Sequence, residues 1–390
     1  RNMRLAFRIV VDGRDQGQNT PLYVFEAGAK WYSDPNSGKE TVRKSPYPDD
    51  PVFQEKYTTF IEAFAKQFNN PDIVDFIDGY GLGKWGEAHS MVYEDYSNKA
   101  KVFDWVTSLY ARCFDRIPLL INYHRLVAAN NVTGWGEVAP DTDYLLQSAI
   151  DKGYSLRHDA FGMNGYYQDW EKEYAARWNY KRPIIMEGGW ITGGTHRYWI
   201  DPSGEYRQGH PEDVRQGEFN ASAEAHVNMM DFRIGDETNS WFTKSFSLVK
   251  RFIAEGGYRL YPDRISLPVK VNTGQEIVIE HRWNNLGWGY CPTNIPQWNQ
   301  KYKVAFALLD SKNSVMRIYV DKQTDLSRWL KGTPTSYKFN LKLEGAPTGN
   351  YSWAVGLVDV TKKNNIGLQM AVSEGLLESG WVKLLPVTIR

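Results

Sequence analysis

Two glutamates stand where the chain leaves an apolar, strand-like segment. Glu187 directly follows the apolar run 184–186, and Glu87 follows the glycine-rich segment 79–83, which could bring the backbone close to a ligand. A buried carboxylate without partners is costly, so Glu187 is expected to have partners. Taken singly, Glu187 could be a structural ion pair and Glu87 a solvated loop acid. Together they fit glycoside hydrolysis, in which one protonated carboxyl donates to the leaving oxygen and one carboxylate attacks or activates water.

Other polar and aromatic residues follow the same strand-like segments and are candidates for contacting a sugar. Arg8 could hydrogen-bond the nucleophile or a sugar hydroxyl, or form a structural ion pair. Asp159 could bind hydroxyls or cap a turn. Tryptophan rings can stack on the apolar face of a sugar, but they are equally common in cores. The candidate substrate-binding residues are Arg8, Trp85, His89, Tyr123, His158, Asp159, Asn164, Trp190 and Trp241.

Metal and cofactor sites are not indicated. The seven histidines lack the spacing of metal ligands, and two cysteines, Cys113 and Cys291, can build neither a zinc site nor a disulfide framework. No glycine-rich phosphate loop with lysine is present, and the glycines of segment 79–83 lack the spacing of a dinucleotide motif. We therefore expect no metal ion and no cofactor.

The first part of the chain has the alternating pattern of βα units. Short apolar runs alternate with segments whose apolar residues recur at helical spacing, while residues 12–50 have the composition of a long loop. Six units are expected between residue 1 and about residue 257. The expected strands are 3–11, 73–77, 117–122, 156–163, 183–187 and 227–234, and the expected helices are 52–68, 102–113, 141–152, 168–179, 211–226 and 243–255.

Strands alternating with helices predict a parallel sheet. The steps of about 28–45 residues between later strand ends are near the length of one unit in a (β/α)8 TIM-type barrel. Function in such barrels sits at the carboxyl ends of the strands, where Glu87 and Glu187 are expected. Residues 1–257 are therefore interpreted as a barrel that supplies the catalytic domain.

From residue 258 the pattern changes to short strands with period-2 alternation, separated by turn residues. The expected strands include 276–281, 303–308, 337–341 and 351–357. Such a series predicts an antiparallel β-sandwich over 258–390. The fold class is therefore α/β followed by all-β. The sandwich could bind glycan or only brace the barrel.

The length and composition agree with a two-domain protein that binds a sugar. The chain has 390 residues, more than one hydrophobic core usually serves. Lysine plus arginine equals aspartate plus glutamate at 46 each, so the chain lacks the charge surplus expected of a nucleic-acid binder. No apolar run approaches the ~20 residues of a membrane span. Aromatic residues make up 14% of the chain, which leaves some of them available as sugar platforms.

In these motifs the first part of the chain resembles the clan A glycoside hydrolases. In that clan the acid/base glutamate follows barrel strand four and the nucleophilic glutamate ends strand seven. The resemblance implies that Glu87 is the acid/base and Glu187 the nucleophile of a retaining β-glycosidase acting on an oligo- or polysaccharide. It also implies that 3–11 is strand three, so we expect a longer natural chain with ~60–100 further residues upstream.

A closer resemblance is to an uncharacterised bacterial family that joins such a barrel to a sandwich, domain of unknown function 4832. The matching segments are 7–8, 83–87, 157–161, 186–188 and 380–384. This resemblance implies a secreted, periplasmic or cell-surface location. The oligomeric state is not indicated.

One position departs from the clan. Gly86 stands where the clan usually has an asparagine that contacts the sugar 2-hydroxyl. Either Lys84, His89 or Tyr123 makes that contact, or the protein is a carbohydrate-binding protein on a degenerate glycosidase barrel. Another hydrolase on the same scaffold is a third interpretation.

Overall fold

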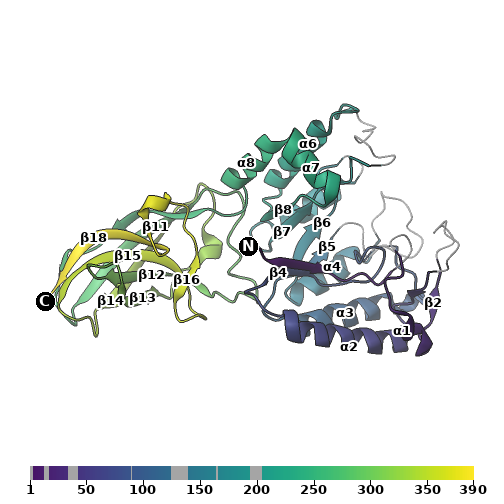
Figure 1. The fold of residues 1–390 in the computed structure, drawn as a ribbon, viewed down its shortest axis with the longest axis horizontal. Coiled ribbons are helices and arrows are strands. Elements are labelled where there is room, and N and C mark those ends of the chain that lie inside the picture. Colours follow the sequence, from purple (N-terminus) through teal and green to yellow (C-terminus); the bar gives the residue numbers. More distant parts are fainter. Residues whose placement is uncertain are drawn as a thin grey trace. The chain divides into compact units, whose positions relative to one another are not determined.

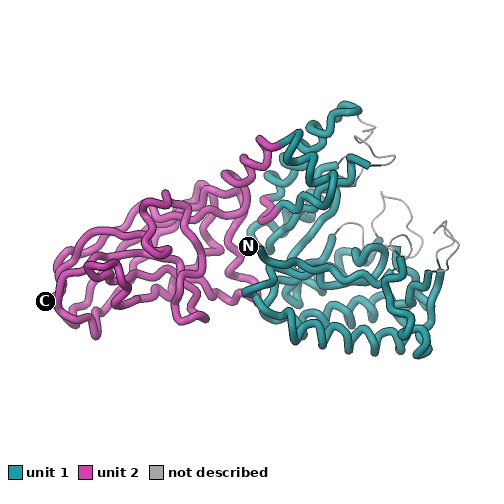
Figure 2. Tube along the Cα trace, viewed as in Figure 1, with its two compact units in different colours: residues 1–225, 230–245 teal, residues 226–229, 246–390 magenta. Residues whose placement is uncertain are grey.

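The computed structural model describes residues 3–12, 17–33, 43–88, 90–123, 139–163, 166–193 and 204–390. The predicted site residues His89 and Asn164 lie outside these ranges. The chain forms two compact units (Figure 2). Unit 1 comprises residues 1–225 and 230–245, and unit 2 comprises 226–229 and 246–390.

A six-stranded sheet forms the centre of the first part of the chain (Figure 1). Its strands lie in sequence order, and the printed pairs between neighbours are parallel. The predicted parallel sheet is thereby confirmed, whereas an eight-stranded barrel is not. The strands are β1 (Leu5–Arg8), β4 (Val74–Asp78), β5 (Leu119–Asn122), β6 (Ser155–His158), β7 (Ile184–Glu187) and β8 (Met229–Asp231).

Helices follow the strands, as the helical spacing of apolar residues predicted. Asp50 starts the longest one by accepting a hydrogen bond from Phe53 N at 2.8 Å, and Pro51 occupies the first turn. The helices are α1 (Leu22–Glu26), α2 (Pro51–Phe68), α3 (Lys99–Cys113), α4 (Thr142–Asp151), α5 (Asp169–Trp178), α6 (Pro211–Glu224), α7 (Gly235–Lys244) and α8 (Phe246–Glu255).

The interpretation of 12–50 as loop alone is wrong. This segment contains α1 and a two-stranded ladder of β2 (Trp31–Tyr32) and β3 (Ser45–Pro46). The ladder is held by Asp12, whose carboxylate accepts hydrogen bonds from Ser45 Oγ at 2.8 Å and Tyr32 Oη at 3.1 Å. These contacts are distant in sequence, so local composition does not report them.

Unit 2 consists mainly of two sheets with a common core. The smaller has the order β14-β11-β9, and the larger has β10-β18-β15-β12-β13, with β16 and β17 attached. Buried and exposed residues alternate along the first part of β11, as the period-2 pattern predicted. The strands are β9 (Leu260–Ser266), β10 (Lys270–Val271), β11 (Glu276–Asn285), β12 (Tyr302–Leu309), β13 (Val315–Asp321), β14 (Thr335–Lys342), β15 (Gly349–Asp359), β16 (Asn365–Leu368), β17 (Leu377–Glu378) and β18 (Trp381–Ile389).

The core of unit 2 is aromatic and aliphatic. Trp283 from the smaller sheet belongs to the same buried cluster as Phe306 and Trp353 from the larger sheet. Trp283 also stacks on Trp329, with ring centroids 4.7 Å apart. Much of the tryptophan content of unit 2 is therefore core. No helix within the described ranges is long and apolar enough to cross a membrane.

Candidate functional site

Charged side chains meet at the carboxyl edge of the parallel sheet. Arg8 ends β1, Asp78 ends β4 and Glu187 ends β7. Arg8 donates from Nε to Asp78 Oδ2 at 2.6 Å and from Nη2 to Glu187 Oε2 at 2.9 Å. The carboxyl ends of parallel strands share one edge of a sheet, so strands distant in sequence bring these groups together.

Arg8 also joins the two predicted catalytic glutamates. Its Nη1 donates to Glu87 Oε1, while its Nη2 holds Glu187. Glu87 and Glu187 are both buried, at 5% and 7% exposure. The two carboxyl groups are thus separated by no more than one guanidinium and two hydrogen bonds.

A second arginine, Arg157 on β6, fixes Glu187 from the adjacent strand. Its Nη2 donates to Glu187 Oε2 at 2.6 Å and to Asp231 Oδ2 at 2.8 Å. Burial alone would raise the pKa of Glu187, but the guanidinium groups of Arg157, Arg8 and Arg233 outweigh it and hold that pKa well below the usual range. Glu187 is therefore an ionised carboxylate at neutral pH.

A third arginine, Arg233, approaches from the segment after β8. Its Nη1 donates to Asp159 Oδ1 at 2.7 Å and to Gly188 O at 2.9 Å, and lies 3.6 Å from Glu187 Oε1. Its guanidinium lies over the Trp190 ring, 5.1 Å from the centroid. Burial raises the pKa of Asp159; Arg233 opposes that shift, and the nearby carboxylates of Glu187 and Glu87 add to it.

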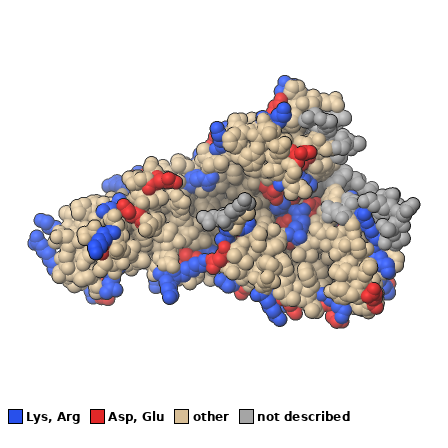
Figure 3. All heavy atoms as spheres, viewed as in Figure 1, with Lys and Arg blue, Asp and Glu red and all other residues tan. Residues whose placement is uncertain are grey.

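The cluster carries more negative than positive groups. Acidic and basic atoms lie side by side in a hollow on the face of unit 1 seen in Figure 3. Among the described residues of this cluster, three guanidinium groups meet five carboxylates: Arg8, Arg157 and Arg233 against Asp78, Glu87, Asp159, Glu187 and Asp231.

The backbone around Glu87 explains the glycine before it. Gly86 has φ +74°, and a Cβ there would lie 2.3 Å from Ile9 O. The neighbours Trp85 and Ala88 also have positive φ, at 58° and 59°. No asparagine fits position 86 on this backbone, so this departure from the clan is built into the turn.

The glycines of segment 79–83 serve packing in the described structure. A Cβ on Gly79 would meet Tyr154 Cε1 at 2.9 Å, and one on Gly81 would meet Tyr57 Oη at 2.2 Å. The backbone here approaches tyrosine side chains. The expectation that these glycines open the backbone to a ligand is not supported.

Three predicted substrate-binding residues are enclosed in protein. Tyr123, His158 and Trp241 have no exposed surface. His158 Nε2 lies 3.2 Å from Glu171 Oε1, and Glu171 also caps the start of α5. Trp241 lies beneath the Arg215 guanidinium, 5.1 Å from its ring centroid. In this conformation the three rings are packed in protein and present no open face, and their contacts with a sugar stay a prediction.

Two predicted tryptophans remain partly accessible near the glutamates. Trp85 and Trp190 are half-buried. Lys84 Nζ lies 4.3 Å from the Trp85 ring centroid. In the same way, the Arg233 guanidinium covers one face of the Trp190 ring. Each ring is thus paired with a cation.

Several members of the cluster were not predicted. The missed residues share one signal, a charged side chain within or just after an apolar strand. Such a side chain is costly to bury without partners. They are Asp78, Arg157, Asp231 and Arg233.

A second buried network fixes the segment that follows Glu187. Glu218 Oε1 accepts a hydrogen bond from Gly189 N, and Glu237 Oε1 accepts one from Thr192 N at 2.9 Å. Arg215 joins the two carboxylates at 2.7 and 2.6 Å. Residues 189–192 are thereby tied to α6 and α7.

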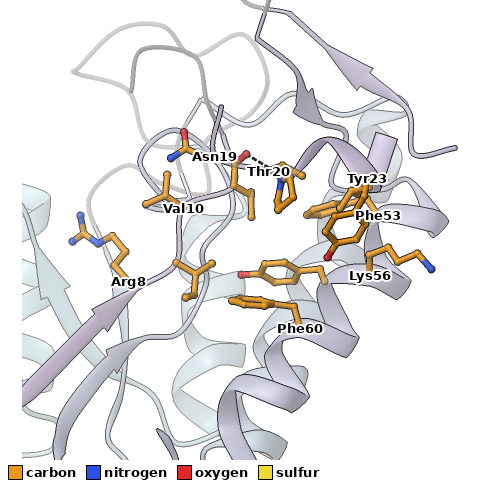
Figure 4. Close-up of a pocket in the computed structure, with 13 residues that line it drawn as sticks. Arg8, Val10, Asn19, Thr20, Tyr23, Phe53, Lys56 and Phe60 are labelled. Atoms are coloured by element: carbon orange, nitrogen blue, oxygen red, sulfur yellow. Dashed lines mark hydrogen bonds between the residues drawn. The ribbon is translucent and has the colours of Figure 1, made fainter. Parts of the chain in front are cut away.

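A cavity of about 420 Å³ lies beside the charged cluster. It is lined by residues 8–11, by residues between Asn19 and Val24, and by the α2 side chains Phe53, Tyr57 and Phe60. In Figure 4 the Arg8 guanidinium points away from these aromatic rings. Neither Glu87 nor Glu187 lines this cavity, so it is separate from the paired carboxylates.

Comparisons with known proteins do not assign the chain to a family. No protein-family model and no curated protein matches it, so the resemblance to the barrel-plus-sandwich family stays a prediction.

Solved structures give distant similarities. The catalytic domain of a beta-amylase from Paenibacillus polymyxa matches with 12% identity and a TM-score of 0.35, over 62% of this chain and 80% of that one. A beta-glucosidase from Listeria innocua in complex with glucose matches with 9% identity and a TM-score of 0.20, over 73% of this chain and 38% of that one. A CARDB domain from Pyrococcus furiosus matches with 14% identity and a TM-score of 0.21, over 34% of this chain and 93% of that one. Scores this low carry no argument about fold or function.

Proposed function

We propose that this protein is a retaining glycoside hydrolase acting on a β-linked oligo- or polysaccharide. Glu187 attacks the anomeric carbon, while Glu87 protonates the leaving oxygen and then activates water. The observation that carries the proposal is the Arg8 guanidinium, which binds Glu87 and Glu187 at once. Double displacement needs two carboxyl groups about 5–5.5 Å apart, and a shared guanidinium keeps them close.

The electrostatics support the assignment of roles. A nucleophile must be ionised, and the three arginines keep Glu187 so by lowering its pKa. In the cluster Glu187 lies among three guanidinium groups and stays ionised beside them. A carboxylate that faces the anomeric carbon favours the positive charge of an oxocarbenium-like transition state.

The rest of the molecule fits this proposal as a scaffold. We propose that residues 1–257 belong to a TIM-type barrel and that 258–390 form an accessory sandwich. The sheet order of unit 1 supports the first part and the two sheets of unit 2 support the second. A carbohydrate is the expected partner, and a location outside the bacterial cytoplasm is the expected place of action.

The test uses Glu187→Gln and Glu87→Gln in the full chain, with Glu173→Gln on the exposed face of α5 as matched control. Aryl β-glycosides and a polysaccharide panel serve as substrates, and NMR reports the anomer released first. We expect a rate loss of at least about 1,000-fold for Glu187→Gln, because the nucleophile is removed. Retention of configuration is expected for the wild type. Near-wild-type hydrolysis by either site variant would contradict the roles.

One observation favours a second candidate, a carbohydrate-binding protein without turnover. A general acid must give up a proton to the leaving oxygen, whereas the carboxyl group of Glu87 is occupied by the Arg8 guanidinium. This candidate expects sugar binding that survives Glu87→Gln and no hydrolysis of any glycan. Calorimetric titration of both proteins with the same oligosaccharides separates the two functions.

A further inference from the structure

Arg233 and Asp159 form a polar pair with unused hydrogen-bonding capacity beside Glu187. Arg233 uses only Nη1 of its guanidinium, and Asp159 uses only Oδ1, which also accepts from Ala160 N at 2.7 Å. Within the described residues, Nε and Nη2 of Arg233 and Oδ2 of Asp159 have no hydrogen-bond partner. Guanidinium N–H donors are thus presented beside a carboxyl oxygen, which accepts a hydrogen bond when ionised and donates one when protonated.

The pair is held firmly by its surroundings. The Trp190 ring lies under the guanidinium plane, and Gly188 O accepts from Nη1. Arg233 has φ 67°, a conformation uncommon for this residue, and Thr238 Oγ1 donates to its carbonyl at 2.7 Å. A fixed guanidinium loses little conformational freedom when it binds a ligand.

The position relative to Glu187 limits what the pair can contact. Arg233 Nη1 lies 3.6 Å from Glu187 Oε1. In a sugar whose anomeric carbon faces Glu187, the neighbouring carbon is C2, and its hydroxyl both donates and accepts hydrogen bonds. A donor beside an acceptor matches that group. Gly86 cannot supply such a contact, and Tyr123 is fully buried.

We infer that Arg233 and Asp159 bind the 2-hydroxyl of the sugar that Glu187 attacks, with Trp190 as a positioning residue for the guanidinium. The inference rests on the proposed function. It limits the substrate class to glycosides with a free 2-hydroxyl and excludes 2-acetamido and 2-deoxy sugars. Contacts to this hydroxyl strengthen in the transition state. Loss of the contact from Arg233 or Asp159 should therefore lower kcat more than it raises KM.

The experiment is a cycle of two substrates and two proteins. The 2,4-dinitrophenyl β-glycoside with the highest rate and its 2-deoxy analogue are hydrolysed by the wild type and by Arg233→Met. We expect Arg233→Met to lose about 100-fold in kcat/KM on the parent glycoside and under threefold on the analogue. Arg233→Lys keeps the charge without the planar fork and should recover part of the loss.

A matched control comes from a surface pair of the same chemistry. Arg177 Nη1 lies 3.4 Å from Asp143 Oδ1, and the Arg177 side chain is half exposed. Arg177→Met should therefore leave kcat/KM unchanged on both substrates. If Arg233 has only a structural role, Arg233→Met should lower kcat/KM by the same factor on both substrates. That result would overturn the inference. Asp159→Asn should reproduce the selective loss on the parent glycoside.

A binding measurement separates this inference from the proposed function. The Arg233 Nε–H resonance is followed by NMR while the wild type is titrated with methyl β-glucopyranoside, methyl β-galactopyranoside or methyl β-mannopyranoside, and with their 2-deoxy counterparts. A shift with a parent sugar and none with its 2-deoxy form supports the subsite even if no glycoside is hydrolysed. Equal shifts, or none with any sugar, would overturn it whether or not hydrolysis is observed.

Discussion

Unit 1 and unit 2 each bury a polar cluster, and the two clusters are built differently. In unit 2, Trp283 Nε1 donates to His281 Nδ1 at 2.7 Å, and His281 Nε2 lies 3.0 Å from Asp321 Oδ2. An indole N–H only donates, so it fixes Nδ1 as the acceptor and places the ring proton on Nε2. The indole N–H, both imidazole nitrogens and the carboxyl oxygen of this hydrogen-bonded series therefore all have partners inside an apolar core.

The strand-end cluster of unit 1 instead holds five acidic side chains and three guanidinium groups among the described residues. Its backbone also departs from common conformations, since Trp85, Ala88, Ala160 and Arg233 all have positive φ. Such conformations are costly and collect at functional sites. The comparison shows that the polar groups of the unit 2 cluster are paired in series, whereas the unit 1 cluster gathers several acidic groups and guanidinium groups around two glutamates.

The largest expected effect comes from breaking the charged cluster of unit 1. Arg157→Met leaves Glu187 and Asp231 without a shared buried cation, which costs about 3–5 kcal/mol in the free energy of unfolding. Hydrogen exchange on peptides from β6 and β7 measures the loss within unit 1. Arg177→Met, which breaks an exposed pair, should cost under about 1 kcal/mol. Equal losses in the two variants would mean that the charged cluster does not support the fold.

Much of the organisation of unit 1 is predictable because it follows from periodicity. A short apolar run such as 184–186, bounded by Pro183 and Glu187, indicates a buried strand, and parallel strands end at one edge of a sheet. The place of Glu187 at that edge follows from this rule, whereas Glu87 reaches it from the segment after β4. Gly153 follows the C-cap of α4 with φ 95°, a conformation that favours glycine at the end of a helix.

Arg8 was expected as a possible partner of the nucleophile, and it contacts Glu187, but the other partners of these glutamates are not predictable from local sequence. Arg157 lies in a fully buried strand, and nothing nearby in sequence shows that its charge meets Glu187 and Asp231. The same limit applies to Trp241, since a tryptophan after a strand can face solvent or, as here, pack against Arg215. Long-range contacts decide both cases.

A smaller effect is expected from the hydrogen-bonded series Trp283–His281–Asp321 of unit 2. Trp283→Phe keeps a ring to pack on Trp329 but removes the N–H that His281 accepts, which costs about 1–3 kcal/mol in the stability of unit 2. Urea unfolding followed by tryptophan fluorescence and far-UV circular dichroism measures it. Trp298→Phe is the matched control, because its ring is only partly buried and its indole makes no hydrogen bond within the described residues. If Trp283→Phe lowers the stability of unit 2 no more than Trp298→Phe does, the hydrogen bonds between Trp283, His281 and Asp321 do not stabilise the fold.

The smallest effect is a pH dependence that only the charged cluster should show. The pKa of Glu187 is lower in the folded protein than in the unfolded chain, so its ionisation stabilises the fold above its ordinary pKa of about 4.3. That contribution is lost as the pH falls below this value towards the folded pKa. The Tm difference between wild type and Glu187→Gln should therefore be constant from pH 7 to 5 and narrow by about 2–4 °C between pH 5 and 3. Calorimetric scans at fixed ionic strength measure it, with Glu173→Gln as the exposed control. If this Tm difference stays constant down to pH 3, the ionised form of Glu187 does not stabilise the fold. The charged cluster of unit 1 would then show no pH dependence that sets it apart from the cluster of unit 2.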